Sequence, residues 1–337
     1  MRRNTGREWF ALFAGLVLCA AMGIGAFAYY AYAPTPVAEL PAQFSVRSGS
    51  SLRSAAQQLA GAGVLRHPEA FVLIGRLLGQ AGNLKAGTYE IDRPVSPLEL
   101  LRKITQGDYT LVGITFVEGW TFKQMRKALD EHQGASHDSR GVSDAELLQR
   151  LAITESSPEG WFFPDTYYFS AGTSDLRILR RAHALMKGHL AAQWEKRAAD
   201  LPIASAYEAL VLASIIEKET ARADERPLIA AVFVNRLRVG MRLQTDPTVI
   251  YGMGNAFDGN LRKADLTADT PYNTYTRTGL PPTPIAMPGL ASVTAAVNPA
   301  RSDALYFVSK NDGSHHFSRT LGEHERAVTK YQKTGRR

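Results

Sequence analysis

The chain has 337 residues, of which 45% are hydrophobic and 21% charged, and its formal net charge is +7. This length allows one large domain or two ordinary ones, and the composition is that of a folded protein. The charge suits an anionic partner, but Lys and Arg form no dense run and no nucleic-acid-binding motif, so we expect no nucleic acid to bind. The single cysteine, Cys19, excludes an intramolecular disulfide, a cysteine-based zinc site and a catalytic thiol.

An uncharged apolar stretch runs from Trp9 to Ala33. About 20 apolar residues span a bilayer core, so the stretch predicts a transmembrane helix over residues 9–33. Arg2, Arg3 and Arg7 precede it, and the positive-inside rule then places residues 1–8 in the cytoplasm and the body of the chain in the periplasm. The predicted localisation is therefore the cell inner membrane, with a single pass.

A cleaved signal peptide is the alternative interpretation of this stretch, because Ala31, Tyr32 and Ala33 resemble a small-residue cleavage site. The apolar stretch is longer than a typical signal core and lacks an abrupt polar break before that site. We therefore favour a retained anchor. No later stretch is long and apolar enough to span a membrane.

Residues 34–41 hold three prolines and predict an extended linker. After it, residues 42–109 predict a small α/β module with strands over residues 43–46 and 85–91. A first helix follows Ser51, and a second, opened by Pro68, carries Phe71, Ile74, Leu77 and Leu78 on one face.

A third helix of this module begins at Ser96, which has capping-box spacing to Glu99, and Gly107 ends it. The β-α-α-β order of the module resembles the LysM glycan-binding fold. That resemblance implies a glycan-binding role for residues 42–109.

Residues 110–337 predict a larger mixed α/β domain, so the fold class of the whole chain is α+β. A strand is expected over residues 111–117, a helix through Met125 and Leu129, a polar loop over 132–143, and helices near 144–153 and 175–199. An aromatic-rich segment, Glu159 to Tyr168, lies between the last two helices. It fits a hydrophobic core and the wall of a sugar-binding groove equally well.

A buried helix is predicted to begin at Ser205, which has capping-box spacing to Glu208, and to end in Glu217, Lys218 and Glu219. Residues two apart on a helix point in different directions, so the two glutamates cannot share one face. Glu219 lies on the side of the apolar residues that precede it, which would raise its pKa and keep it protonated as a general acid requires. The alternative is an ordinary solvated helix end.

Two arginines, Arg222 and Arg226, follow closely, and either would lower the pKa of Glu219 if it reached that carboxyl. Asp224 is predicted to cap the next helix, which has Pro227 in its first turn and ends at Gly240.

Polar residues that hydrogen-bond sugars occur in two irregular stretches downstream. The first is a loop-like run with Gln244, Thr245 and Asp246, and the second contains Tyr272 and Asn273. Long loops inside a compact domain are usually functional or disordered, and the prolines and aromatics here argue against disorder. These five residues are candidates for binding substrate, although Asp246 could instead brace its loop.

The chain as a whole resembles the YceG-like family of endolytic murein transglycosylases. The resemblance rests on motifs in matching order and spacing: Glu118-Gly119-Trp120, the segment Glu159 to Tyr167, Ala213 to Thr220, Asn235-Arg236-Leu237, Leu243 to Thr248, Tyr272 to Tyr275, Gly279 to Pro282, and Tyr306-Phe307-Val308. It implies that Glu219, the second glutamate of Glu-Lys-Glu-Thr, is the catalytic acid. Thr283 departs from the family pattern, where a glycine is common.

The family reaction explains why a single catalytic carboxylate suffices. A hydrolytic glycosidase needs two carboxylates. The resemblance implies instead that the C6 hydroxyl of N-acetylmuramic acid attacks, leaving a 1,6-anhydro end, so that Glu219 serves first as acid and then as base. No metal or cofactor is expected, and the partners expected are peptidoglycan strands, cell-wall synthases such as penicillin-binding proteins, and the inner membrane.

Three rival functions would also suit a protein on the outer face of the membrane. A serine hydrolase of the penicillin-binding type is disfavoured because Lys333-Thr334-Gly335 occurs without any Ser-x-x-Lys. A metal hydrolase is disfavoured because the eight histidines are scattered and the pair His315-His316 lacks ligand spacing. A non-catalytic, membrane-anchored, glycan-binding scaffold for cell-wall synthases remains the serious alternative.

Overall fold

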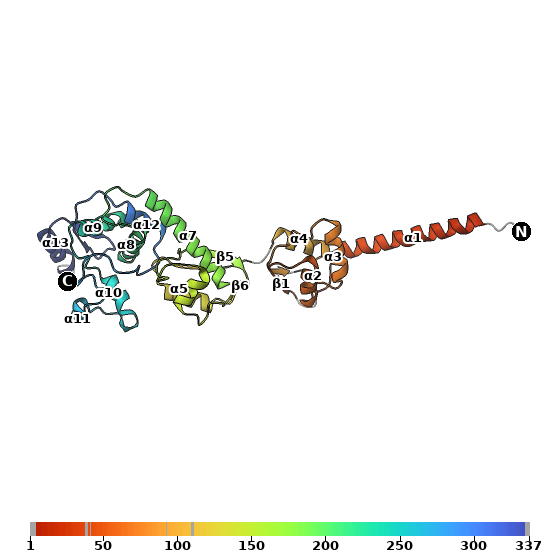
Figure 1. The fold of residues 1–337 in the computed structure, drawn as a ribbon, viewed down its shortest axis with the longest axis horizontal. Helices are drawn as coiled ribbons and strands as arrows, with labels where there is room; N and C mark the ends of the chain where they lie inside the picture. Colours follow the sequence, from red (N-terminus) through yellow and green to blue (C-terminus); the bar gives the residue numbers. More distant parts are fainter. Residues whose placement is uncertain (1–4, 38–39, 41, 92, 109–110, 334–337) are drawn as a thin grey trace. The chain divides into compact units, whose positions relative to one another are not determined.

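The computed structural model describes residues 5–37, 40, 42–91, 93–108 and 111–333 (Figure 1). Arg2 and Arg3, the predicted boundary at residues 109–110, and Thr334 and Gly335 lie outside the described residues, as does the side chain of Arg7. The chain divides into two compact units. The first comprises Met1–Val112, Gly134–Ser136 and Tyr168–Thr173, and the second comprises Gly113–Gln133, His137–Tyr167 and Ser174–Arg337. Helices and short two-stranded sheets make up both, which confirms a mixed α/β architecture.

Up to residue 108 the elements follow the predicted order closely. They are α1 (Thr5–Tyr32), β1 (Ala42–Val46), α2 (Leu52–Gly61), α3 (Pro68–Leu77), β2 (Gly87–Ile91) and α4 (Pro97–Gln106). Strands β1 and β2 pair antiparallel, with Phe44 opposite Tyr89, and their rings stack in the core. The capping box of Ser96 and Glu99 is confirmed, and Gly107 ends α4 in the left-handed conformation.

The membrane-length helix α1 is joined to this unit by contacts at its C-terminal end. Residues Leu12–Tyr32 are long and apolar enough to cross a membrane, a test that a signal sequence also passes. Ala31 is buried in the core, and the Tyr30 hydroxyl donates to the His67 carbonyl at 2.9 Å. Thr35 is also buried, and its amide donates to Val95 at 2.9 Å. The start of the predicted linker is therefore packed against the unit.

Helix α3 differs from its prediction on the face that it was expected to bury. Phe71 and Ile74 are buried, but Leu77 is 69% exposed and Leu78 is 51% exposed. The face is thus apolar along its length and covered only in its first half.

From residue 111 onward, helices again outnumber strands. The elements are β3 (Leu111–Thr115), α5 (Phe122–Glu131), β4 (Ala135–Ser136), α6 (Asp144–Leu151), β5 (Thr166–Ser170), β6 (Thr173–Ser174), α7 (Asp175–Glu195), α8 (Ala206–Glu219), α9 (Arg226–Arg238), α10 (Asp246–Met253), a 3-10 turn η1 (Gly254–Ala256), α11 (Lys263–Thr267), α12 (Leu290–Val297), β7 (Tyr306–Ser309), β8 (His315–Ser318), α13 (Leu321–Val328) and a last turn η2 (Thr329–Lys333). Sheets form between β3 and β5, between β4 and β6, and between β7 and β8.

Helix α8 is the central helix of the second unit, and it contacts α7, α9, α10 and α12 (Figure 1). Every residue from Ala209 to Ile216 is buried, as predicted from an apolar sequence. Ser205 caps the helix by accepting from the Glu208 amide at 3.2 Å. Ser214 is the polar exception inside, and its hydroxyl accepts a hydrogen bond from the Ile285 amide at 3.0 Å.

Two local predictions are corrected. Asp224 does not cap α9, because the cap position belongs to Glu225 and Asp224 binds Arg222 instead. The run from Gln244 onward is not all loop, because α10 begins at Asp246 with a proline in its first turn, where no amide hydrogen is needed. For the aromatic segment, where core and groove wall were both open, the structure favours core, since Trp161, Phe162 and Tyr167 are buried.

Candidate active site

Glu217 lies at the end of α8, and its side chain is only 5% exposed and hydrogen-bonded through both oxygens. One carboxylate oxygen pairs with the Arg226 guanidinium at 2.9 Å, and the other accepts from the Gly289 amide at 2.9 Å and the Ser292 hydroxyl at 2.7 Å. Gly289 is the N-cap residue of α12, where helices carry amides without an internal partner. Glu217 therefore ties three helices together and has no oxygen left for substrate.

Glu219, two residues on, has a different environment. Its side chain is only partly exposed, and the Thr245 hydroxyl donates to one of its oxygens. Burial is the main cause that raises the pKa of Glu219, and the negative charge of Asp246 acts in the same direction. The Thr245 hydrogen bond and the charges of His315 and Arg236 lower that pKa in part. The net result is a carboxyl that holds its proton above the usual range.

The two arginines that might have ionised Glu219 have other partners. Arg226 pairs with Glu217 and lies 3.5 Å from Glu118, while Arg222 binds Asp224 at 2.8 Å. In the described part of the chain, neither guanidinium forms an ion pair with Glu219. Burial therefore remains the main cause of the raised pKa of Glu219.

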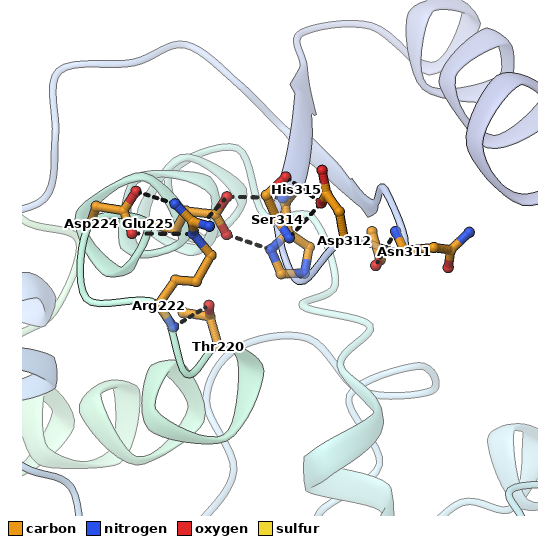
Figure 2. A network of polar contacts seen from close by, with 9 residues as sticks. Thr220, Arg222, Asp224, Glu225, Asn311, Asp312, Ser314 and His315 are labelled. Carbon is orange, nitrogen blue, oxygen red and sulfur yellow. Dashed lines mark hydrogen bonds and ion pairs between the residues drawn. The ribbon is translucent and has the colours of Figure 1, made fainter.

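The loop that follows Glu219 is fastened by the polar network of Figure 2. The Thr220 hydroxyl accepts from the Arg222 amide at 3.0 Å, and the Arg222 side chain reaches Asp224 and Glu225. Glu225 in turn accepts from the amide of His315 at 2.9 Å and lies 2.6 Å from its Nδ1. The hairpin β7–β8 therefore holds the connection between α8 and α9.

Thr245 and its neighbours form the opposite side of the site. The Thr245 amide donates to the Thr274 hydroxyl at 3.1 Å, and the preceding Gln244 amide donates to the Thr274 carbonyl at 3.1 Å. Gln244 has φ +50, a conformation that non-glycine residues adopt rarely and that recurs at functional sites. Its side chain is exposed. These bonds fix the Thr245 hydroxyl against Glu219.

Asp246 is exposed at the first position of α10, where a negative charge suits the helix dipole. The Tyr275 hydroxyl donates to its Oδ1 at 2.6 Å. Its carboxylate is close enough to Glu219 to raise the pKa of that group. The structure thus brings together Glu219, Thr245, Asp246 and Tyr275, of which only Tyr275 was not a predicted site residue.

Tyr272 and Asn273 take different places. Tyr272 is half-buried, and its ring packs edge-on against that of Tyr251. The hydroxyl groups of Tyr272 and Thr283 are 2.8 Å apart. Asn273 is buried, and its amide nitrogen donates to the carbonyl oxygens of Asp265, Leu266 and Ala268. Asn273 therefore braces the loop around α11 and presents no free polar group to the open side.

Sequence reasoning missed a second perturbed carboxyl, Glu159. It is only 4% exposed, accepts from the Phe122 amide at 2.9 Å and from the Tyr251 hydroxyl at 3.1 Å. Burial raises the pKa of Glu159 to about 7. It lies on a cavity of about 1120 Å³ that Ile250 and Tyr251 of α10 also line. A glutamate inside an aromatic core segment was the signal that could have found it.

This arrangement can donate and recover one proton. Glu219 is a partly exposed carboxyl whose pKa is raised by burial and which a hydroxyl holds in place, and both features suit a general acid. Among the described residues, no group of three or more His, Cys, Asp or Glu is arranged to hold a metal ion.

Comparison with known proteins places this chain in a family. Residues 44–330 match the YceG-like family. An endolytic murein transglycosylase of Bacillus subtilis (strain 168) is 33% identical over 328 residues, which cover 91% of this chain and 90% of that protein. One of Streptococcus pneumoniae serotype 2 is 27% identical over 94% of this chain, and this chain spans 64% of its length. The crystal structure of a YceG-like protein of Listeria monocytogenes is 28% identical, covers 84% of this chain and superposes with a TM-score of 0.52. The chain belongs to the YceG-like family.

Proposed function

We propose that this protein is an endolytic peptidoglycan lytic transglycosylase, a lyase that cleaves the glycosidic bond between N-acetylmuramic acid and N-acetylglucosamine in nascent strands. The observation that carries the proposal is the contrast at the end of α8: the carboxylate of Glu217 is bonded to three partners, whereas Glu219 is partly exposed and has its pKa raised by burial. Relatives named as endolytic murein transglycosylases match nine-tenths or more of the chain.

Glu219 would donate its proton to the glycosidic oxygen while the bond from that oxygen to C1 of N-acetylmuramic acid breaks. The carboxylate left behind would take the proton of the C6 hydroxyl, and the C6 oxygen would attack C1. The products are a free N-acetylglucosamine hydroxyl and a 1,6-anhydro end, with the proton back on Glu219. Since no water adds, the reaction is a lyase reaction.

Asp246 would stabilise the positive charge that develops at C1, since its carboxylate is exposed and oriented by Tyr275. Thr245 would position the acid, and the exposed Gln244 would contact sugar. Tyr272 would form part of the wall towards the cavity at the other end of α10. Asn273 would act only by bracing its loop.

The same proposal covers the placement of the enzyme. Helix α1 would be a retained inner-membrane anchor with a cytoplasmic N-terminus, and the catalytic domain would be periplasmic. Residues 42–109 would be a LysM-like module that binds glycan, residues 110–337 the catalytic domain, and cell-wall synthases the partners that supply new strands. A tether suits action on strands close to where they are made.

The deciding experiment compares Glu219→Gln with wild type on defined nascent glycan strands, with mass analysis of the products. Wild type should form ends one water lighter than those of hydrolysis, and Glu219→Gln should form them about 100-fold to 10,000-fold more slowly while it still binds strands. Glu325→Gln, which removes an exposed carboxylate from α13, is the matched control and should cleave normally. Formation of anhydro products by Glu219→Gln at the wild-type rate would refute the assignment, and the absence of cleavage by wild type would favour the scaffold alternative.

A further inference from the structure

The first unit carries an apolar groove between the end of α1 and helices α3 and α4. Its volume is about 730 Å³, within the range of small-molecule sites. Phe27 and Ala31 of α1 form one wall, and Leu77, Leu78 and Leu101 form the other. The groove is therefore built jointly by the membrane-length helix and by the module that follows it.

The level of the groove along α1 is fixed by its lining. Because Phe27 and Ala31 lie within the apolar segment Leu12–Tyr32, the groove extends to the depth of the last turns of that segment. Leu77 and Leu78 share that groove and are more than half exposed. If α1 spans a bilayer, the two leucines reach the depth at which apolar side chains leave water.

The charges around the groove are of one sign. Lys85 and Arg102 are exposed on its lining, and no Asp or Glu lines it. Within the described part of the chain, no ion pair uses either cation. Tyrosines, which favour the membrane interface, occupy the same end of α1, and Tyr29 and Tyr32 are exposed. An apolar groove with cations at its edge is complementary to a lipid, whose apolar acyl chain is joined to an anionic headgroup.

We propose that this groove binds a lipid of the outer leaflet of the inner membrane, with an acyl chain against Leu77 and Leu78 and an anionic phospholipid headgroup at Lys85 and Arg102. The inference rests on the anchoring of α1 in a membrane, which belongs to the proposed function. The module would then lie on the bilayer surface in a fixed orientation, held by α1, by Thr35 and by the lipid.

Depth measurements on the full-length chain in nanodiscs test the proposal. A nitroxide is attached in turn to native Cys19, to Leu78→Cys and to Leu111→Cys, the last two in a Cys19→Ser background. Leu111 is the matched control, since it has the same residue type, the same unit and the same 51% exposure as Leu78. Oxygen, which concentrates in lipid, and a water-soluble nickel chelate report the depth of each label by their relative collision rates.

The expected result is that oxygen dominates at positions 19 and 78 and the nickel chelate at position 111. If position 19 is in lipid and position 78 is as accessible to nickel as position 111, the groove proposal is overturned while the anchor stands. If position 19 itself is in water, the anchor and the groove proposal both fail. Protection of position 78 from both reagents would mean that a protein surface covers it, which also overturns the lipid.

The headgroup part of the proposal has its own test. The nanodiscs contain a mixture of phosphatidylcholine and phosphatidylglycerol, and the phosphatidylglycerol retained by the purified protein is counted by mass spectrometry. Replacing both Lys85 and Arg102 by Gln should reduce that count. Replacing both Arg47 and Arg53, exposed cations outside the groove, should leave it unchanged. Equal retention in the two double variants would refute an anionic headgroup at this site.

Discussion

Replacing each of the two glutamates at the end of α8 by glutamine should affect different properties of the protein. Glu217→Gln should lower its stability, whereas Glu219→Gln should lower its rate of cleavage. Glu217→Gln removes the negative charge that compensates the Arg226 guanidinium, whose side chain is 10% exposed. Removing one partner of a buried ion pair costs roughly 3–5 kcal/mol because it leaves the other charge uncompensated. Glu118, 3.5 Å from Arg226, keeps part of that compensation, so we expect the low end, about 3 kcal/mol.

Glu219→Gln should change stability far less. The glutamine amide oxygen can still accept from the Thr245 hydroxyl, and the burial that raises the pKa of Glu219 already disfavours a charge there. We expect less than about 1 kcal/mol, the net worth of one ordinary hydrogen bond. Cleavage should nevertheless fall by about 100-fold to 10,000-fold, which is the contribution typical of a general acid.

The assay is thermal unfolding of the full-length protein in detergent, followed by near-ultraviolet circular dichroism, beside cleavage of nascent glycan. For a domain of about 200 residues, 3 kcal/mol corresponds to a fall in Tm of roughly 6–12 °C. Glu217→Gln should show that fall, whereas Glu219→Gln and the exposed control Glu325→Gln should melt with wild type. A Tm for Glu217→Gln within about 1 °C of wild type would show that the buried pair does not hold the three helices, contrary to the reasoning.

The remaining predictions concern protonation and packing. Asp246→Asn removes a charge that raises the pKa of Glu219, so the alkaline limb of the kcat/KM profile should move to lower pH. Thr245→Val removes a hydrogen bond that lowers the same pKa, so the alkaline limb should move to higher pH. Shifts in the same direction would contradict this origin of the raised pKa. Glu159 has its folded pKa raised from 4.5 to about 7, so the folded state binds the extra proton and stability should fall by about 3 kcal/mol as pH rises through that window. Denaturant titrations at pH 4.5 and 8 should show this slope in wild type and its loss in Glu159→Gln. Gly160 and Gly119 have φ +81 and +78, but an added Cβ lies 2.6 Å from Pro284 at the first and no closer than 3.7 Å to any atom at the second. Gly160→Ala should therefore lower the free energy of unfolding by about 1–3 kcal/mol more than Gly119→Ala, and equal losses would mean that backbone strain alone matters.

Local signals predicted the local structure well. Ser96 and Glu99, and Ser205 with its amide donor Glu208, lie within one helical turn, so their spacing alone identified both helix starts. The start of α10 was missed although Asp246 and a following proline are typical first-turn residues, because the polar run around them was interpreted as a loop.

Which candidate residues can contact substrate depends on tertiary contacts that sequence spacing does not reveal. What distinguishes Glu217 from Glu219 is that Glu217 is bonded to residues 72 and 75 positions away, at the start of α12. Glu159 is linked to Tyr251 across 92 residues. Helical periodicity predicts that the two carboxylates point in different directions. Only tertiary packing shows which of them has all its hydrogen bonds made within the protein and which can still contact substrate.

Thr283 lies where the family resemblance leads us to expect glycine, and its side chain makes two contacts. Its hydroxyl lies 2.8 Å from that of Tyr272 and donates to the Pro284 carbonyl at 2.9 Å. A glycine at this position would offer neither contact. This chain therefore fixes Tyr272 by a side chain that relatives with glycine would lack.

The hydrogen bonds between Glu225 and His315 affect the stage of synthesis at which the chain can first cleave its substrate. The two residues are 90 positions apart, and His315 belongs to the last hairpin of the chain. Helix α8, with its acid, emerges long before that hairpin exists, and until then the loop after Glu219 has no support from β8. We therefore expect a growing chain to be inactive until the β7–β8 hairpin has been synthesised and folded.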